Sequence, residues 1–528
     1  MRLLQDGLAA SANRQPEAPA IVDGETTLTY GQLDEASSRL ARLFQEHGCV
    51  RGDRVCLLLP KSPEAIVAML AALKAGCAYV PVSPSGPAAR VARILSSCEP
   101  RLLILTGAVR PLLDEVFSTG AAPPLGVGTL EPAAIAGERF RTLFCGADLA
   151  ATRGDPAPRN CTSSDAAHIL FTSGSTGEPK GVVITHQNVL CFVDWANAYF
   201  GAGEGERWSG QTPIHFDLST YDIYGAIHAG AALHLVPPEL GMMPKRLSAF
   251  IREARLTQWF SVPSVFNYMA KFDAVAQDDF PSLRRVLWCG EVLPTPTLIY
   301  WMQRLPHASF TNLYGPTEAT IASSYHTLER CPEDPRAPVP IGRACGGERL
   351  LVLDAERRPV PQGSNGDLYI QGAGLSPGYW RDPEKTAAAF LPHPDEPGER
   401  IYRTGDLASV GPDGLFHFHG RADTQIKSRG YRIELGEIEC ALQTLPVLKE
   451  CAVVAIDLGG FEGALICCAF APLEGAHVTP IELRSLLARL LPAYMIPARW
   501  LALPALPKNV NGKIDRPRLK ESFLADAH

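Results

Sequence analysis

Side chains suited to chemistry lie closest together in the segment Phe171–Gly181, which reads FTSGSTGEPKG. Its backbone amides, its hydroxyls and one ammonium group could together bind a polyphosphate. The candidate ligands are Thr172, Ser173, Gly174, Ser175, Thr176 and Lys180. A Walker A loop is disfavoured, because that loop needs Gly-Lys-Ser/Thr at the start of a helix and Lys180 lies between Pro179 and Gly181. A flexible surface loop is the alternative reading of such a composition.

Alternating helical and extended patterns must position this loop. Apolar residues at helical spacing predict helices at Ala65–Lys74 and Pro244–Ala254. Short apolar runs predict strands at Ala78–Val82, Ala167–Phe171, Thr257–Val262 and Leu283–Cys289. This alternation favours an α/β fold with largely parallel sheets, in which binding sites lie at the carboxyl ends of the strands.

The pattern changes twice along the rest of the chain. From Gly346, short strands and Gly/Pro turns predict a small β-rich subdomain of about 346–422. After a polar turn, a helix–strand–strand–helix pattern predicts a small α+β domain, with a boundary near Asp423. We therefore expect a large N-terminal domain, 1–422, made of two α/β subdomains and the β-rich subdomain, followed by a C-terminal domain, 423–528.

Composition excludes several classes of protein. Hydrophobic residues make up 46% of the 528 residues and charged residues 20%, which is typical of a globular chain. The net charge of −7 and the lack of a long basic run argue against a nucleic-acid partner. The 14 cysteines include no C-x-x-C pair, so we expect reduced thiols and no structural zinc. No apolar run is long enough to span a membrane, and Asp6 interrupts any signal-peptide core, so we expect a cytoplasmic protein without a membrane partner.

Several motifs occur in an order that resembles one family. The hydroxyl-rich loop is followed by NLYGPTE at 312–318, GDLYIQGAGLSPGY at 366–379, YRTGDL at 402–407, GRADTQIKSRGYRIELGEIE at 420–439 and PKNVNGKIDR at 507–516. These motifs resemble those of the adenylate-forming superfamily, which includes acyl-CoA synthetases, luciferases and the amino-acid adenylation domains of nonribosomal peptide synthesis. The resemblance extends over nearly the whole chain, from LTYG at 28–31 onward.

The resemblance implies that ATP and Mg²⁺ are cofactors and that a carboxylate attacks the α-phosphorus of ATP. Charge then builds on the phosphates, where a cation stabilises it best. Lys513 is the expected catalytic cation that bridges the substrate carboxylate and ATP. Glu318 is the expected Mg²⁺ ligand, because magnesium prefers hard oxygen ligands, and Thr317 is expected to contact the α-phosphate.

Further residues are expected to hold the nucleotide. Tyr314 offers a flat face for adenine and Asn312 an amide for its exocyclic amine, with Gly315 beside them. Asp406 resembles the residue that binds the ribose hydroxyls, and Phe418 stands where an aromatic residue often flanks adenine. Arg421 is expected to contact ribose or phosphate.

The resemblance also implies a mobile C-terminal domain that rotates about Asp423. After adenylation, Lys513 would leave the site and the loop containing Arg429 and Gly430 would enter it for thioester formation. Lys427 could serve that second state or lie in solvent.

The segment HFDLSTYDIY at 215–224 indicates which class of acid is the substrate. Its Phe216-Asp217 pair resembles the motif of amino-acid adenylation domains, in which Asp217 would pair with the substrate ammonium. Such a pair is expected because a buried ammonium is costly without a carboxylate. The alternatives are that Asp217 caps a helix or that Asp222 is the amine partner.

The family's pocket layout predicts a lining that is apolar apart from Asp217. It consists of Asp217, Phe216, Leu218, Tyr221, Phe260, Leu287, Cys289, Leu313, Ile321 and Ala322. A charged or amide side chain would be left unpaired there, so we expect a small or medium apolar amino acid. The lining resembles that of free-standing prolyl-carrier-protein ligases, which makes L-proline the specific prediction. Valine, alanine or a β-amino acid would fit nearly as well.

The chain ends soon after Lys513 without a carrier-domain motif, so we expect an acyl or peptidyl carrier protein to supply its phosphopantetheine thiol in trans. One alternative is an acyl- or aryl-acid ligase that uses coenzyme A, against which Asp217 argues. The other is a catalytically silent nucleotide-binding scaffold. The presence together of Asp217, Glu318, Asp406 and Lys513 argues against it.

Overall fold

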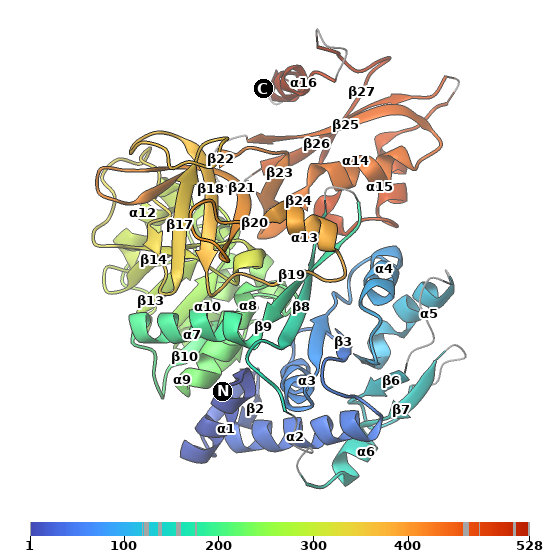
Figure 1. The fold of residues 1–528 in the computed structure, drawn as a ribbon, viewed down its shortest axis with the longest axis vertical. Helices are drawn as coiled ribbons and strands as arrows, with labels where there is room; N and C mark the ends of the chain where they lie inside the picture. Colours follow the sequence, from blue (N-terminus) through green and yellow to red (C-terminus); the bar gives the residue numbers. More distant parts are fainter. Residues whose placement is uncertain are drawn as a thin grey trace.

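A computed structural model describes most of the chain. The described residues are 2–118, 120, 126–135, 140–154, 160–174, 177–457, 464–474, 476–509 and 514–525. Figure 1 shows α1 and α2 toward one end of the molecule and the C-terminal strands and helix at the other. No described helix combines the length and apolar content needed to cross a bilayer.

A nine-stranded sheet carries most of the predicted substrate-site residues. Its inner strands are parallel, and its order is β16 (Arg343–Ala344), β15 (Ser324–Leu328), β14 (Ser309–Tyr314), β13 (Arg285–Trp288), β12 (Gln258–Ser261), β10 (Arg207–Gly210), β11 (Ala232–Leu235), β1 (Pro19–Asp23) and β2 (Thr26–Thr29). Phe260 pairs with Leu287 and Trp288 pairs with Asn312. This register brings residues far apart in sequence to one end of the sheet.

An eight-stranded sheet carries the hydroxyl-rich loop. Its order is β19 (Gly378–Tyr379), β9 (Lys180–Thr185), β8 (Ala166–Thr172), β4 (Ala78–Pro81), β3 (Arg54–Leu58), β5 (Leu102–Leu105), β6 (Gly126–Thr129) and β7 (Arg141–Phe144). The strands from β8 through β7 run parallel, whereas β8 and β9 form an antiparallel pair with the loop between them. The α/β expectation is thereby confirmed.

Helices cover both sheets, and their ends follow local sequence signals. Ser62 accepts a hydrogen bond from the Ala65 amide at the start of α3, and Pro63 occupies the first helical position, where its missing N–H costs nothing. Residues of α3 are buried on nearly every side and belong to one core shared with both sheets. The helices of this part are α1 (Leu4–Arg14), α2 (Tyr30–Glu46), α3 (Pro63–Lys74), α4 (Ala88–Cys98), α5 (Arg110–Ser118), α6 (Gly146–Ala151), α7 (His186–Phe200), α8 (Leu218–Thr220), α9 (Ala226–Ala229), α10 (Pro244–Glu253), α11 (Pro263–Lys271) and α12 (Thr295–Arg304).

A five-stranded antiparallel sheet lies within the part predicted to be β-rich. It consists of β17 (Glu348–Leu353), β18 (Gly366–Gly372), β20 (Phe390–Pro392), β21 (Arg400–Val410) and β22 (Phe416–Arg421), and α13 (Pro383–Ala389) precedes β20. The short strand β19 leaves this part to pair with β9 of the eight-stranded sheet. The limits 346–422 stay a prediction.

The described residues of the C-terminal part form a hairpin, a sheet and three α-helices. The hairpin pairs β23 (Gln425–Ser428) with β24 (Tyr431–Glu434), and the sheet contains β25 (Leu448–Asp457), β26 (Ala464–Pro472) and β27 (Arg499–Ala502). The helices are α14 (Leu435–Gln443), α15 (Pro480–Leu487) and α16 (Arg516–Ala525). Two apolar clusters stabilise these elements separately from the main core. Asp423 lies between β22 and β23, and the boundary placed there stays a prediction.

A buried ion pair ties the beginnings of β10 and β13 together. Glu206 and Arg285 are 6% and 7% exposed and form a direct ion pair. Glu206 also accepts from the Trp208 indole at 2.8 Å, and Arg285 donates to the Phe200 carbonyl at 2.7 Å. Removing one partner would leave a buried charge unpaired, which costs more than losing an exposed pair.

We expect Arg285→Met to destabilise the N-terminal part by about 3 kcal/mol or more, because Glu206 would lose its buried counter-ion. The measurement is the urea unfolding midpoint of the full chain. Arg284→Met is the matched control, since Arg284 is 70% exposed and lies 3.7 Å from the same carboxylate. If both substitutions lowered the unfolding midpoint equally, the claim that burial makes the loss of the Arg285–Glu206 pair costly would be wrong.

Candidate active site

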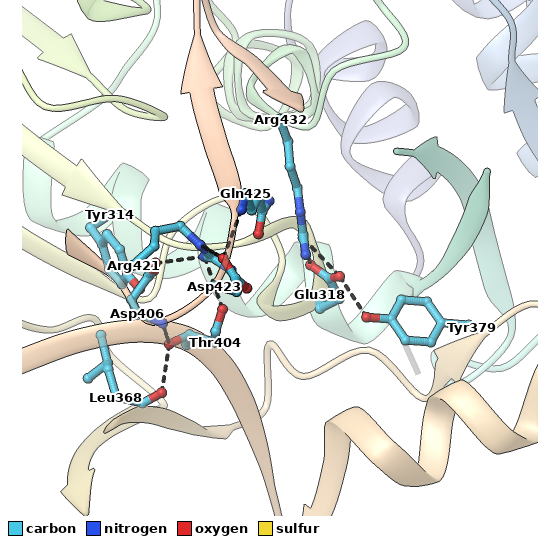
Figure 2. Close-up of polar contacts among 10 residues, drawn as sticks. All are labelled: Tyr314, Glu318, Leu368, Tyr379, Thr404, Asp406, Arg421, Asp423, Gln425 and Arg432. Carbon is cyan, nitrogen blue, oxygen red and sulfur yellow. Dashed lines mark hydrogen bonds and ion pairs between the residues drawn. The ribbon is translucent and has the colours of Figure 1, made fainter. Parts of the chain in front are cut away.

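One cavity opens where the carboxyl ends of the strands meet the hairpin β23–β24. Its wall includes Thr172 and Thr317 from the large N-terminal part, and Gln425, Lys427 and Arg432 from the hairpin. Figure 2 shows polar contacts among residues in and beside its wall, with Glu318 from the N-terminal part facing Arg432 of the hairpin. The predicted nucleotide and amine ligands Thr172, Ser173, Asp217, Gly315, Thr317, Asp406 and Arg421 all line this cavity.

The end of β8 supplies the described part of the hydroxyl-rich loop. The Thr172 hydroxyl is buried and has no hydrogen-bond partner among the described residues. The Ser173 hydroxyl donates to the Arg432 carbonyl at 2.6 Å, and the Gly174 amide donates to Glu437 at 3.3 Å. Ser175 and Thr176 lie outside the described residues. An unpartnered hydroxyl at the cavity wall suits an anionic ligand.

Glu318 is a fully buried carboxylate beside two cations. Its oxygens accept from the Arg432 guanidinium at 2.9 and 2.7 Å and from the Tyr379 hydroxyl at 2.8 Å (Figure 2). Burial alone would raise the pKa of Glu318, but the charges of Arg432 and Lys180 outweigh it and lower the pKa to about 2. Glu318 is therefore ionised at neutral pH, and a carboxylate of this kind fits Mg²⁺ when that ion is bound. Among the described residues, no three His, Cys, Asp or Glu side chains lie close enough together to hold a metal ion.

Asp406 connects the predicted adenine and ribose residues. Its two oxygens accept from the Tyr314 hydroxyl and, at 2.6 Å, from the Arg421 guanidinium (Figure 2). Arg421 also binds both oxygens of Asp423, at 2.7 and 2.5 Å. The network places a carboxylate, an aromatic ring and a guanidinium at one edge of the cavity, which suits a nucleoside.

The remaining predicted adenine residues lie close to this network. The centroid of the Phe418 ring is 6.4 Å from that of Tyr314. Asn312 donates its amide NH₂ to the Pro340 carbonyl at 2.8 Å, which orients its oxygen as an acceptor. Gly315 packs so closely that a Cβ there would lie 2.6 Å from the Cα of Ala322. A larger residue at 315 would displace the backbone beneath the cavity.

Asp217 faces the same cavity from the segment before α8. Its side chain makes no cap hydrogen bond to the helix and instead accepts from the Thr317 hydroxyl at 2.7 Å. Burial raises the pKa of Asp217, although the Thr317 hydrogen bond and the Lys427 charge oppose this. The helix-cap reading is therefore not supported. Lys427 lies at the cavity wall, with its ammonium 5.5 Å from the Tyr314 ring centroid.

Asp222, the rival amine partner, lies elsewhere. It is 1% exposed on a π-helical turn, Tyr221–Gly225, and neither of its oxygens has a hydrogen-bond partner among the described residues. Burial raises its pKa well above the usual range, against the opposing charge of Lys61. Asp222 is not among the residues that line the cavity with Asp217. Of the two carboxylates, Asp217 is therefore the one placed to meet a ligand in this cavity.

Most of the predicted side-chain pocket is buried apolar core: of the predicted set, Phe216, Asp217 and Leu218 line the cavity, and the others do not. Phe216 packs against Tyr431 of the hairpin, with ring centroids 4.8 Å apart. The Tyr221 and Phe260 rings lie edge to face at 6.1 Å, and the Cys289 thiol faces the Ile321 carbonyl at 3.8 Å. The buried members of this region are Leu218, Tyr221, Phe260, Leu287, Cys289, Leu313, Ile321 and Ala322. All of them belong to the main apolar core, which both large sheets share, and of these eight residues Leu218 also lines the cavity.

The loop of the hairpin β23–β24 lies at the cavity. The Gly430 amide donates to Glu291 at 2.8 Å, and Gly430 and Tyr431 line the cavity. Lys513 lies outside the described residues. Sequence reasoning missed Arg432, Glu437, Tyr379 and Arg90. The motif 420–439 contains two of them, but only the packing of the two parts against each other shows which atoms they contact.

Comparisons with known proteins agree with this geometry. A family model described as AMP-binding enzyme matches residues 8–380, and one described as AMP-binding enzyme C-terminal domain matches residues 437–513. The chain is 34% identical to the L-proline–L-prolyl-carrier protein ligase of Pseudomonas fluorescens, over 98% of both chains. It is also 34% identical to tyrocidine synthase 3 of Brevibacillus parabrevis, but it spans 8% of the length of that relative. Among solved structures, the Vibrio cholerae adenylation domain AlmE in complex with glycyl-adenosine-5′-phosphate superposes with a TM-score of 0.86, at 26% identity and over 99% and 98% of the two chains.

Tyr379→Phe should destabilise the protein at neutral pH by about 2 kcal/mol, because Glu318 loses a hydrogen bond to its charged form. Ionised Glu318 stabilises the fold at any pH above the pKa of a glutamate in the unfolded chain, about 4.3. This stabilisation is lost as the pH falls toward the pKa of Glu318 in the folded protein, about 2. The difference in the free energy of unfolding between the variant and the wild type should therefore be largest at pH 7. It should shrink as the pH falls from about 4 to about 2.

Chemical denaturation across this pH range measures the effect. Tyr369→Phe is the control, since no hydrogen bond of the Tyr369 hydroxyl to a described residue is found and Tyr369 lies on β18, away from Glu318. A difference between Tyr379→Phe and the wild type that stays constant from pH 7 to pH 2 would contradict this role of Glu318.

Proposed function

The chain belongs to the family of AMP-binding enzymes, and on that premise we propose that it activates a small apolar amino acid with ATP and transfers it to the thiol of a carrier protein. In the first step, the amino-acid carboxylate would attack the α-phosphorus, and pyrophosphate would leave. In the second, the thiol sulfur would attack the acyl carbon, and AMP would leave with the bond electrons. The similarity to a prolyl-carrier protein ligase over the full length of both chains supports this reaction.

The position of Asp217 is the observation that carries the proposal. Its carboxylate lines the cavity beside Leu218 and accepts a hydrogen bond from the Thr317 hydroxyl at 2.7 Å. The Asp217 carboxylate would form an ion pair with the ammonium group of an amino-acid substrate. A fatty or aryl acid has no such group and would leave the carboxylate without a cationic partner from the substrate. The substrate class is therefore an amino acid.

Other side chains would hold the nucleotide around that amino acid. Thr172 and the loop amides would bind phosphate oxygens, Asp406 would accept from the ribose hydroxyls, and Tyr314 would stack on adenine. Glu318 would ligate Mg²⁺, which when bound neutralises charge on the phosphates. Lys513 would bring a cation to the reacting oxygens. These roles follow the family motifs and are supported by the convergence of the described residues at one cavity.

A second cavity, which adjoins the first, offers a route by which a thiol acceptor could reach the site. It shares Arg90, Phe171, His215, Tyr431 and Tyr494 with the first cavity. From there it extends along Ser83, Ser85, Pro492 and Ala493, between the N-terminal part and the C-terminal part. A phosphopantetheine arm of a carrier protein could reach the acyl carbon by this path, with the Gly430 loop beside it.

L-Proline is the specific substrate that we propose. The predicted lining has no charged group apart from Asp217, and its members from Leu218 onward are 5% exposed or less. Little room is left beside Asp217, which favours a compact apolar side chain over a long or polar one. A secondary amine can still donate two hydrogen bonds when it is protonated, so proline would keep the Asp217 contact. Valine, alanine and β-amino acids are the alternatives to test.

ATP–pyrophosphate exchange across amino acids, β-amino acids, aryl acids and short fatty acids tests this proposal. We expect proline to give the dominant signal. If another apolar amino acid gives the dominant signal, the proposed reaction stands but the assignment of proline is wrong. If only non-amino acids support exchange, the proposed role of Asp217 is wrong.

Asp217→Asn should raise the KM for the amino acid by roughly 100-fold, because the buried ammonium would lose its counter-ion at a cost of about 3 kcal/mol. The KM for ATP should change little. Asp114→Asn, on the exposed face of α5, is the control. An unchanged amino-acid KM in the Asp217 variant would contradict the assignment.

A further inference from the structure

A strained turn follows Glu318 in the segment between β14 and β15. Thr320 and Ile321 have φ values of 56° and 70°, in the left-handed region that β-branched residues rarely adopt. The Ala322 amide donates to the Thr320 carbonyl at 2.9 Å, which closes a three-residue turn centred on Ile321. With a positive φ at its centre, this is the rare and strained class of γ-turn. Such a turn persists only where surrounding contacts hold it.

The Thr320 side chain ties this turn to the segment between β18 and β19. Its hydroxyl donates to the Gly374 carbonyl at 2.7 Å, and Thr320 is 3% exposed. The Gly374 amide in turn donates to Oε1 of Glu348, at the start of β17, at 2.7 Å. Only glycine fits here, because a Cβ at 374 would lie 2.7 Å from that oxygen and 3.0 Å from the Ala319 carbonyl oxygen. The turn is thereby fixed to the five-stranded sheet.

The same turn leads to the carboxylate that lines the cavity. The Thr320 amide donates to the Thr317 carbonyl at 3.1 Å, at the end of the short 3₁₀ helix Thr317–Ala319. The Thr317 hydroxyl, at the cavity wall, donates to Asp217 at 2.7 Å. A continuous series of hydrogen-bonded residues therefore connects Glu348 to Asp217.

Glu318 lies in the same 3₁₀ helix but has contacts of its own. Its carboxylate accepts from Tyr379 and Arg432, and its carbonyl accepts from the Ser376 amide at 2.9 Å. Loss of the Thr320 hydroxyl removes none of these contacts. A change at Thr320 should therefore affect the binding of the amino acid more than that of ATP.

We propose that Thr320 and Glu348 are positioning residues, which hold the strained turn so that Thr317 orients the Asp217 carboxylate toward the substrate ammonium. The inference rests on the proposed function, since that function assigns the ammonium to Asp217. Neither Thr320 nor Glu348 is in the wall of the cavity. They act through the turn, because a carboxylate that is already ordered loses less conformational freedom when it pairs with a ligand.

The test measures the KM for L-proline and for ATP by ATP–pyrophosphate exchange with the full chain. If the exchange screen gives another dominant amino acid, that amino acid replaces proline. Thr320→Val keeps the shape of the side chain but removes its hydroxyl. We expect it to raise the amino-acid KM roughly ten-fold and the ATP KM less than about two-fold, since one buried hydrogen bond is lost. Thr320→Ser keeps the donor and should restore most of the wild-type KM.

Thr257→Val is the matched control. Thr257 is 4% exposed, and its hydroxyl donates to the Arg207 carbonyl at 3.1 Å, at the amino ends of β12 and β10 and away from the cavity. This substitution also removes a buried hydroxyl, so it should lower the melting temperature much as Thr320→Val does. It should leave both KM values unchanged.

Glu348 provides a second pair of variants. Burial raises the pKa of Glu348 to about 8, so its neutral form predominates at pH 7. Glu348→Gln keeps an uncharged acceptor for the Gly374 amide and should have the wild-type amino-acid KM. Glu348→Leu removes the acceptor and should raise that KM. If Thr320→Val does not fold, this pair decides between the outcomes.

A double-mutant cycle shows whether Thr320 acts through Asp217. In the Asp217→Asn background, adding Thr320→Val should change the amino-acid KM less than about two-fold, because the charge that the turn orients is already absent. Residues that act independently would instead show the same fold-change in both backgrounds.

Two results would overturn the inference while leaving the proposed function intact. One is a Thr320→Val variant that melts at a lower temperature, like Thr257→Val, but keeps the wild-type amino-acid KM. The other is an equal rise in that KM with and without the Asp217 carboxylate. If the wild type gave no exchange with any amino acid, both the inference and the proposed function would be wrong.

Discussion

A buried carboxylate at residue 318 must always face a positive charge, and much of the site is arranged around that requirement. Glu318 has no exposed surface, and Arg432, Lys180 and Tyr379 together keep it ionised. A carboxylate so placed would be costly if it were unpaired. Its positive partners among the described residues are Arg432 of the C-terminal part and Lys180 of the N-terminal part, so this requirement connects the two parts at the site.

The sheets explain how this carboxylate and the other polar groups come to one place. Parallel strands of one sheet end at a common edge. The cavity lies where two such edges meet: β8 of the eight-stranded sheet carries Thr172 to it, and β14 of the nine-stranded sheet brings Tyr314 and the segment leading to Glu318. The antiparallel strands β21 and β22 add Asp406 and Arg421, which face each other in register. The large sheets therefore supply rigid positions, and the hairpin β23–β24 closes the site from the other part of the chain.

Local patterns were sufficient to predict many of these elements. The strand expected at Thr257–Val262 is β12 (Gln258–Ser261), and the helix expected at Pro244–Ala254 is α10 (Pro244–Glu253). The cavity brings Thr172 and Ser173 of the loop together with Asp217, Thr317 and Asp406, whereas Gly174 and Lys180 are not in its wall. These predictions succeeded because strand alternation, helix caps and Gly-rich turns are determined by neighbouring residues.

Contacts between distant segments could not be predicted in this way. Arg432 is 114 residues from Glu318, and Glu437 is 347 residues from Arg90. Each of these residues alone resembles an ordinary polar residue of a hairpin or of the first turn of a helix. Their roles depend on how two separate cores pack together, which no local periodicity describes. The π-helical turn that buries Asp222 also has no simple sequence signal, so the choice between Asp217 and Asp222 needed the structure.

The most direct test of the account is a crystal structure with a non-hydrolysable prolyl-adenylate analogue. We predict that the substrate nitrogen lies within about 3.2 Å of an Asp217 oxygen and that the ribose hydroxyls contact Asp406. An amine bound elsewhere, with Asp217 still paired only to Thr317, would contradict the claim that this carboxylate selects an amino acid.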